Sequence, residues 1–192
     1  MTNVTNWLLF QSAQDIEQFG SPWVSPFAAL TIGGGEASSG PVGFLGAFFQ
    51  TNVLRIMQPS FAGQLPMEFR LLGVEVEIRG RWTGDSSGVR SVEVTSVVGS
   101  STRKNLGSAS FNLNLLKTVV MGGPTDTMNF TEADVANPGF GVQLFGSSSS
   151  FNVTGNTLLI DSLRVRIFWA DLQLPERSRV RTRVALTRGV LS

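Results

Sequence analysis

The chain has 192 residues, of which 42% are hydrophobic and only 15% are charged, and its formal net charge is +1. It contains no cysteine and no histidine, which excludes disulfides, thiolate metal sites and the commonest general base. No run of about 18 apolar residues and no basic leader occurs, so neither a membrane span nor a signal peptide is expected. The length suits a single domain with a full core.

The first half of the chain predicts short strands separated by loops. Residues 7–10 form an apolar segment that is typical of a strand, whereas residues 14–20 are polar and fit a helical turn or a loop. Residues 21–30 contain two prolines and predict an irregular apolar segment or an edge strand. Residues 44–57 predict a strand pair or one buried strand, with Phe49 among the core residues.

Residues 67–81 alternate strictly and predict a strand with one buried face. We expect Val74, Val76 and Ile78 to face the core. The opposite face carries charges that we expect to form cross-strand ion pairs rather than to act in acid–base chemistry: Glu75, Glu77, Arg79 and Arg81. Residues 84–88 predict a hairpin turn that leads into a return strand at 89–98, with Val92, Val94 and Val98 facing inward. Residues 99–107 read as a basic polar loop, and residues 108–120 as one or two further strands.

The strongest strand pattern lies near the end of the chain, at residues 157–169. Its inward face is predicted to hold Leu163, Val165, Ile167 and Trp169. Together with a short strand at 139–145 it is expected to form the closing hairpin. Strands spaced by about ten residues predict an all-β fold, an antiparallel β-sandwich or jelly roll, that spans residues 1–171.

Residues 172–192 predict an extended C-terminal arm. Five arginines and no acidic residue follow Glu176, so the arm carries +5 beyond that point while the preceding part carries −4. Strict alternation of arginine with Val or Thr indicates a strand that pairs with a neighbouring protein. Nucleic acid is a weaker alternative, because no aromatic side chains are interleaved for base stacking, and a merely solvated tail is the third. The residues expected to contact a partner are Arg177, Arg179, Arg181, Arg183, Arg188, Val180, Val184 and Leu186.

Other polar and aromatic residues offer weaker hypotheses. Asp126, Glu132 and Asp134 could ligate calcium, but their spacing matches no EF-hand, and acidic residues at turns more often cap the backbone. No metal and no cofactor is therefore expected. Trp23 and Trp82 are candidate glycan contacts, provided that their rings are exposed.

Several segments follow one another in an order that is similar to a known group. They are Gly-Val-Glu-Val-Glu-Ile at 73–78, a Gly-Gly-x-x-Asp turn at 122–126, the Thr-x-x-Asp-Val to Phe-Gly-Val-x-Leu segment at 131–144, and the strand at 161–169. This order resembles that of small β-sandwich virion proteins of tailed bacteriophages, over roughly residues 7–170. Met128 stands where that group often has an aromatic residue, and the chain has no tyrosine.

The resemblance implies a structural subunit without enzymatic activity, located in the virion and assembled in the bacterial cytoplasm. It favours the tail, in the fibre, baseplate or adaptor region, with capsid decoration (cement) protein as the alternative. A carbohydrate-binding module is a further alternative that uses the same fold. The implied partners are other virion proteins and further copies of the chain, as a trimer, with a host-surface glycan as an additional candidate and no membrane.

Overall fold

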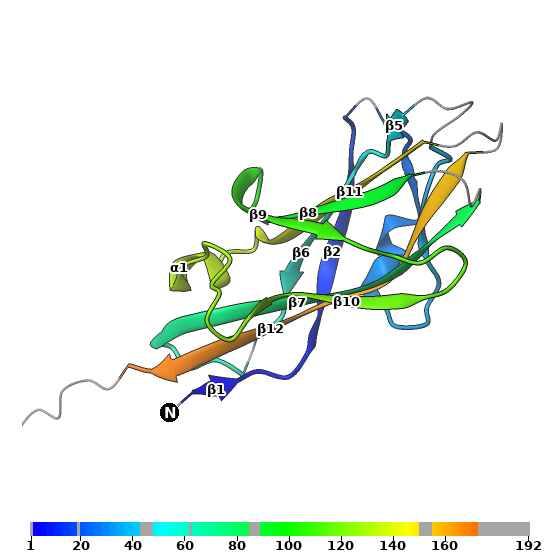
Figure 1. The fold of residues 1–192 in the computed structure, drawn as a ribbon. Helices are drawn as coiled ribbons and strands as arrows, with labels where there is room; N and C mark the ends of the chain where they lie inside the picture. The colour runs from blue at the N-terminus through cyan, green and yellow to red at the C-terminus, as the bar shows by residue number, and fades with distance from the viewer. Residues whose placement is uncertain are drawn as a thin grey trace, which may run out of the picture.

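The computed structural model describes residues 2–18, 20–42, 48–61, 63–84, 89–149 and 155–172. Strands account for most of these residues, and the predicted all-β class is confirmed (Figure 1). The only helices among them are the 3₁₀-helix η1 (Pro26–Leu30) and the short α1 (Glu132–Val135). Neither described helix has the length or the apolar character that crossing a membrane requires.

The strands pair antiparallel and form two layers of a β-sandwich. The main strands of the first layer are β10 (Lys117–Gly123), β7 (Phe69–Gly84) and β12 (Asn156–Asp171). The short strands β1 (Asn3–Val4), β3 (Trp23–Val24) and β4 (Ala37–Ser39) belong to the same layer. The second layer contains β6 (Val53–Pro59), β11 (Phe140–Ser149), β8 (Arg90–Val98) and β9 (Ser101–Ala109), with β5 (Phe48–Gln50) beside β11.

One strand joins the two layers along one side of the molecule. β2 (Leu8–Ile16) pairs with β12 through Leu8 and Leu9, and then with β6 from Phe10 to Ile16. On the other side, β10 and β9 are the terminal strands of the path of paired strands. The sandwich is therefore continuous at β2, whereas among the described strands β9 and β10 each lie at an end of the path opposite it.

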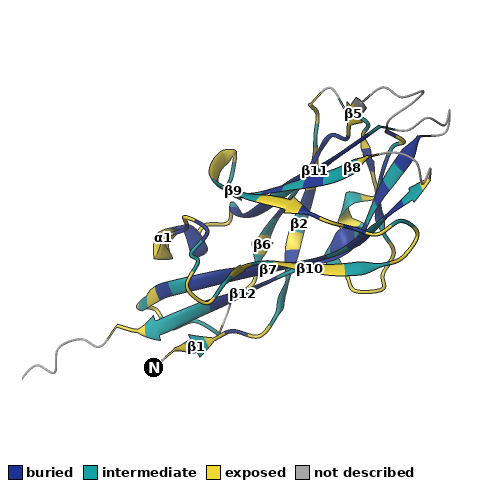
Figure 2. Ribbon diagram, in the orientation of Figure 1, coloured by how far each residue is buried: buried dark blue, intermediate teal, exposed yellow. Residues whose placement is uncertain are grey.

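The core lies between the layers, where the predicted alternation places it. Val74, Val76 and Ile78 of β7 are buried, as are the matching positions of β12, Leu163, Val165 and Ile167. Buried residues recur along both layers (Figure 2). In a strand, successive side chains point to opposite faces, so this burial leaves the charged residues of β7 and β12 on the outer face.

Two predicted strand pairings are wrong. β11 and β12 do not form a closing hairpin, because β12 pairs with β7 over its whole length while β11 pairs with β6 and β8 in the other layer. β8 likewise pairs with β9 and β11 rather than returning along β7, and residues 85–88 lie outside the described part. Alternation identified these strands and their buried faces, but it contains no information about which strand lies alongside.

Two smaller predictions are also corrected. Residues 99–107 were expected to be a loop, but most of them belong to the edge strand β9 (Ser101–Ala109), whose side chains are mostly exposed on both faces. Phe49, expected in the core, is 46% exposed. The predicted boundary between a body ending at 171 and an arm from 172 coincides with the end of β12, but residues 173–192 lie outside the described residues, so the arm remains a prediction.

Candidate interaction surface

The two tryptophans proposed as glycan contacts are buried, so that prediction is wrong. Trp23 is 5% exposed, and its indole Nε1 donates a hydrogen bond to the carbonyl oxygen of Asn52 at 2.7 Å. Trp82 is 1% exposed and packs within the core. A sugar needs an accessible ring face for stacking, and these two rings provide none. All eight arm residues that were expected to contact a partner lie outside the described residues, so their role stays a prediction.

The predicted cross-strand ion pairs are confirmed on the outer face of the first layer. Glu75 accepts a hydrogen bond from Arg166 Nε at 2.6 Å, and Glu77 accepts one from Arg164 Nε at 2.9 Å. Both carboxylates are mostly buried, with side-chain exposures of 11% and 14%. Two more pairs extend the row, Arg79 with Asp161 and Arg81 with Glu36. Because each carboxylate is held by an arginine, this row fits a structural role rather than proton transfer.

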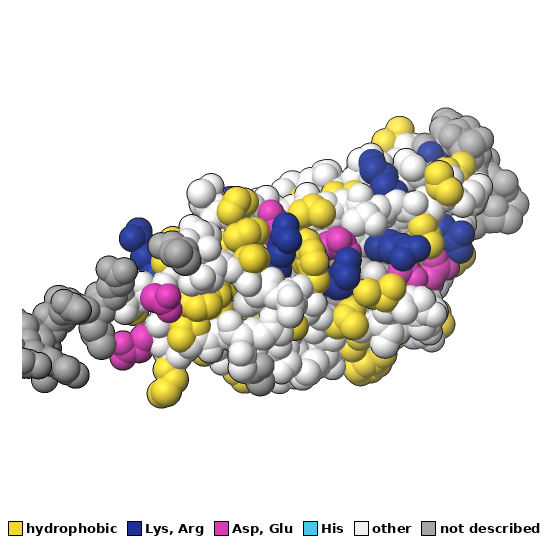
Figure 3. Space-filling model, turned by 90° about the horizontal axis from the view of Figure 1, so that it is seen from below, with side chains coloured by type: hydrophobic (Ala, Val, Ile, Leu, Met, Phe, Trp, Pro, Cys, Tyr) yellow, Lys and Arg dark blue, Asp and Glu magenta, His cyan; other side chains and the backbone are white. Residues whose placement is uncertain are grey.

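An aromatic side chain covers part of this row. The guanidinium of Arg166 lies 4.5 Å from the centre of the Trp7 ring, and that of Arg164 lies 5.5 Å from it. Seen from below, Lys and Arg side chains form a row along the molecule with acidic and hydrophobic side chains among them (Figure 3). The arginines of the row therefore contact the Trp7 ring as well as their carboxylate partners.

The candidate calcium ligands hold a loop against β9 instead. Asp126 accepts hydrogen bonds from Lys104 Nζ at 2.9 Å and from the backbone N–H of Met128 at 2.9 Å. Asp134 accepts from Arg103 at 2.6 Å and forms a capping box with Thr131 at the start of α1. Asp126 and Asp134 therefore accept hydrogen bonds from nearby backbone N–H groups, as expected of acidic residues at turns.

These contacts also change the acidity of the two carboxyl groups. The hydrogen bond from Lys104 is the main cause that lowers the pKa of Asp126. Partial burial raises the pKa of Asp134, but hydrogen bonds from the Thr131 backbone N–H and from Arg103 outweigh it, so the pKa of Asp134 is lowered. Among the described residues, no group of three or more acidic side chains is arranged to hold a metal ion.

A groove of about 550 Å³ opens at the end of the sandwich where β12 finishes. It is lined by residues 67–70, by Glu132, Ala133 and Ala136 at α1, and by Leu172. An adjoining hollow of about 250 Å³ shares Met67, Phe69 and Ala136 and adds apolar residues. We call the apolar residues of both hollows the end surface: Phe61, Leu65, Pro66, Met67, Phe69, Ala133, Val135, Ala136 and Leu172.

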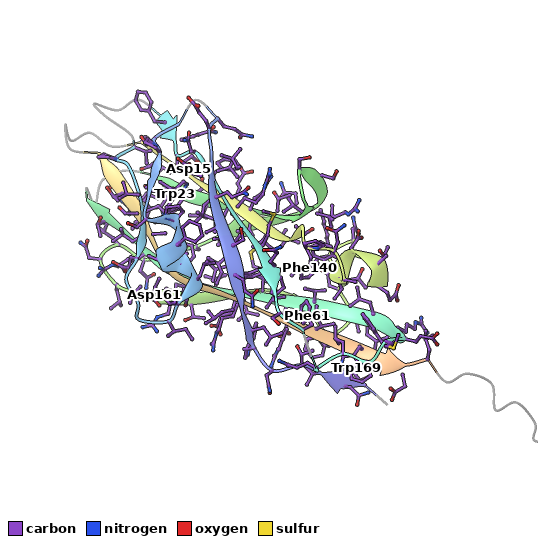
Figure 4. The ribbon with its side chains drawn as sticks, turned by 180° about the vertical axis from the view of Figure 1, so that it is seen from behind. Asp15, Trp23, Phe61, Phe140, Asp161 and Trp169 are labelled. Atoms are coloured by element: carbon purple, nitrogen blue, oxygen red, sulfur yellow. The ribbon has the colours of Figure 1, made fainter. Side chains whose placement is uncertain are left out.

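Several apolar side chains of the end surface are exposed to solvent. The side chain of Met67 is fully solvent-exposed, and Leu172 is 51% exposed. Phe61 and Trp169 lie toward this end of the molecule, whereas Trp23 lies toward the other (Figure 4). Exposed apolar hollows of this kind mark interaction sites, and methionine adapts readily to varied partners. Sequence reasoning missed this surface, although Leu65, Pro66 and Met67, where the predicted strand 67–81 begins, are part of it.

Comparison with known proteins identifies no family. No protein-family model matches the chain, and no curated protein sequence is significantly similar to it. The CBM22-1 xylan-binding domain of Xyn10C from Paenibacillus barcinonensis is similar in structure, with 9% identity, a TM-score of 0.43, and coverage of 86% of this chain and 94% of that chain. The N-terminal cellulose-binding domain of β-1,4-glucanase C from Cellulomonas fimi has 12% identity, a TM-score of 0.37, and coverage of 88% and 90%. Similarity at this level does not indicate a shared function.

Proposed function

We propose that this chain is a non-enzymatic structural subunit of a tailed-bacteriophage virion, located in the tail and assembled through its β-sandwich body and its basic C-terminal segment. The observation that carries the proposal is the end surface. Apolar side chains stand exposed in a hollow at the point where the described chain ends, with the five arginines still to follow. A subunit that buries this surface in an assembly removes the cost of exposing it to water.

The distribution of charge supports an assembly role over an enzymatic one. The carboxylates of the outer face are held by arginines, and Asp126 and Asp134 are held by Lys104, Arg103 and backbone N–H groups. Acid–base catalysis requires a group whose pKa lies near the working pH. The pKa of Asp126 and that of Asp134 are shifted in the opposite direction, away from neutral pH.

The experiment compares particles made with the natural chain and with a variant in which Arg179, Arg181 and Arg183 are all changed to Glu. Mass spectrometry of purified particles should detect the natural chain at a fixed copy number and should not detect the variant. The matched control changes the same three residues to Lys, which keeps the charge and should keep incorporation. Absence of the natural chain from particles would refute the virion role, and unchanged incorporation of the Glu variant would refute the role of the segment.

Antibody labelling of the same particles distinguishes the two virion locations. Label confined to the tail supports the proposal. Label spread over the head would replace the tail location by the cement-protein alternative, in which the subunit decorates the capsid surface.

A further inference from the structure

The end surface has a polar rim that is predominantly acidic. Glu68, Glu132 and Asp171 are exposed beside the groove, and Arg70 is the one basic side chain that lines it. Glu132 accepts a hydrogen bond from the backbone N–H of Leu71, whereas Glu68 and Asp171 form no ion pair with any described residue. This contrasts with the outer face of β7 and β12, where the carboxylates have arginine partners. The rim therefore favours a positively charged, partly apolar occupant.

The chain itself supplies a segment with that chemistry. Residues 173–192 carry five arginines and one acidic residue, Glu176, and they include apolar residues at intervals, among them Leu174, Val180, Val184 and Leu186. Fully extended, such a length reaches on the order of 70 Å, which is more than enough to span to a neighbouring molecule. Arginine suits the rim because its guanidinium pairs with carboxylates in a defined geometry.

The direction of β12 favours a neighbouring copy over the same molecule. β12 pairs with β7 up to its last residue, Asp171 opposite Phe69, and Leu172 then forms part of the wall of the groove. A chain extended in the direction of β12 would pass beyond the groove, and it would have to turn back to enter the groove of its own molecule. Each copy offers one groove and one segment at the same end, so reciprocal exchange produces a closed assembly.

We propose that the end surface is the binding site for residues 173–192 of a second copy of this chain. The apolar side chains of that segment fill the hollows over Met67 and Phe69, and its arginines pair with Glu68, Glu132 and Asp171. This inference rests on the proposed function, because it names the surface on which the assembling segment binds. It predicts that the groove contacts a chemically defined peptide and not a sugar.

Single-cysteine variants of the full chain test the proposal, because the natural chain has no cysteine. One partner carries Ala133→Cys, an exposed position in the groove, and a size tag. The other carries Leu174→Cys, Val180→Cys or Leu186→Cys. After mixing and mild oxidation, non-reducing gels should show a disulfide-linked heterodimer for at least one of the three. The matched control is Val24→Cys, which is 61% exposed in β3 outside the groove and should give none.

The remaining outcomes overturn the inference. A chain that carries both substitutions and forms only an internal disulfide, with no heterodimer on mixing, would show that the segment binds its own groove. Equal cross-linking to Val24→Cys would show random collision, and no cross-linking at any position would show that the segment binds elsewhere. If the natural chain is detected in purified particles but any of these results is obtained, the virion role is retained and this binding site is rejected.

Discussion

Folding of the two-layer body depends on single buried positions such as Val165. It lies in β12 opposite Val76 and is completely buried. Changing Val165 to Asp places an unpaired charge in the core, which costs about 4 kcal/mol or more and should abolish cooperative folding. Tryptophan fluorescence during urea denaturation measures this. The control is Val120→Asp, at a position that is 51% exposed in β10 and should change stability by no more than about 0.5 kcal/mol. A soluble Val165→Asp protein with a natural unfolding midpoint would contradict the inward assignment.

Asp134 makes stability depend on pH. Its pKa is lowered in the folded chain, so its contribution to the free energy of unfolding is fully present above the ordinary carboxyl pKa of about 4 and is lost as the pH falls through the folded pKa. Asp134→Asn should therefore flatten the fall in stability below about pH 4, measured by urea denaturation at several pH values. Glu17→Gln, at an exposed position, is the control that removes one carboxyl group elsewhere. An unchanged slope in Asp134→Asn would contradict the role of the capping box and the Arg103 pair.

For individual residues, the sequence predicts some structural features and not others. Alternation predicted the burial of Val74, Val165 and Ile167 because a half-buried strand imposes a period of two. The burial of Trp82 follows the same period, because Trp82 lies in β7 on the face of Val76 and Ile78. The burial of Trp23 could not be predicted, since tryptophan occurs both in cores and on binding faces. The cross-strand ion pairs were predictable as a class, but the pairing of Glu75 with Arg166 depends on the register of β7 and β12, which the sequence does not specify.

At the scale of elements, the pairing of β7 with β12 is the main structural contact of the first layer. Its outer face adds partly buried ion pairs, among them Glu75 with Arg166, in which the carboxylate side chain is only 11% exposed. A double-mutant cycle with Glu75→Gln and Arg166→Gln should give a coupling energy of about 1 kcal/mol, because solvent screens the arginine side chain, which is 34% exposed.

The Lys104–Asp126 pair provides the matched comparison for this cycle. Both of its side chains are more than one-third exposed, so the corresponding cycle should give a coupling energy of about 0.3 kcal/mol. Urea denaturation measures both cycles in the same buffer, and raising the salt concentration should weaken the exposed pair more. Equal coupling energies for the two pairs would show that burial does not strengthen the β7–β12 contact.

The two wrong strand pairings and the missed strand follow from how the strands pair and from their composition. β11 and β12 are close in sequence, and a hairpin is the usual connection between such strands, yet each has partners on both sides in its own layer. β9 was missed because its residues are polar on both faces, so no period of two appears. It is an edge strand that backbone pairing with β8 and the contacts of Arg103 and Lys104 hold in place.

At the scale of the whole molecule, the groove could not be predicted because three separate stretches of chain build it. The start of β7, α1 and the end of β12 converge at one end of the sandwich, and only the fold brings them together. The basic segment was evident from sequence because its charge and alternation are local properties. Its predicted role in assembly now has a candidate surface, defined by Met67, Ala133 and Leu172, that matches its chemistry.

The proposed assembly depends most on the division between a body that folds by itself and a segment that joins copies together. Sedimentation equilibrium of the full chain and of a chain that ends at Leu172 measures both properties when it is combined with thermal melting. We predict that the full chain sediments as an oligomer, whereas the shortened chain is a monomer that still unfolds cooperatively near the same temperature. An identical mass for the two chains, or a shortened chain that fails to fold, would contradict the account.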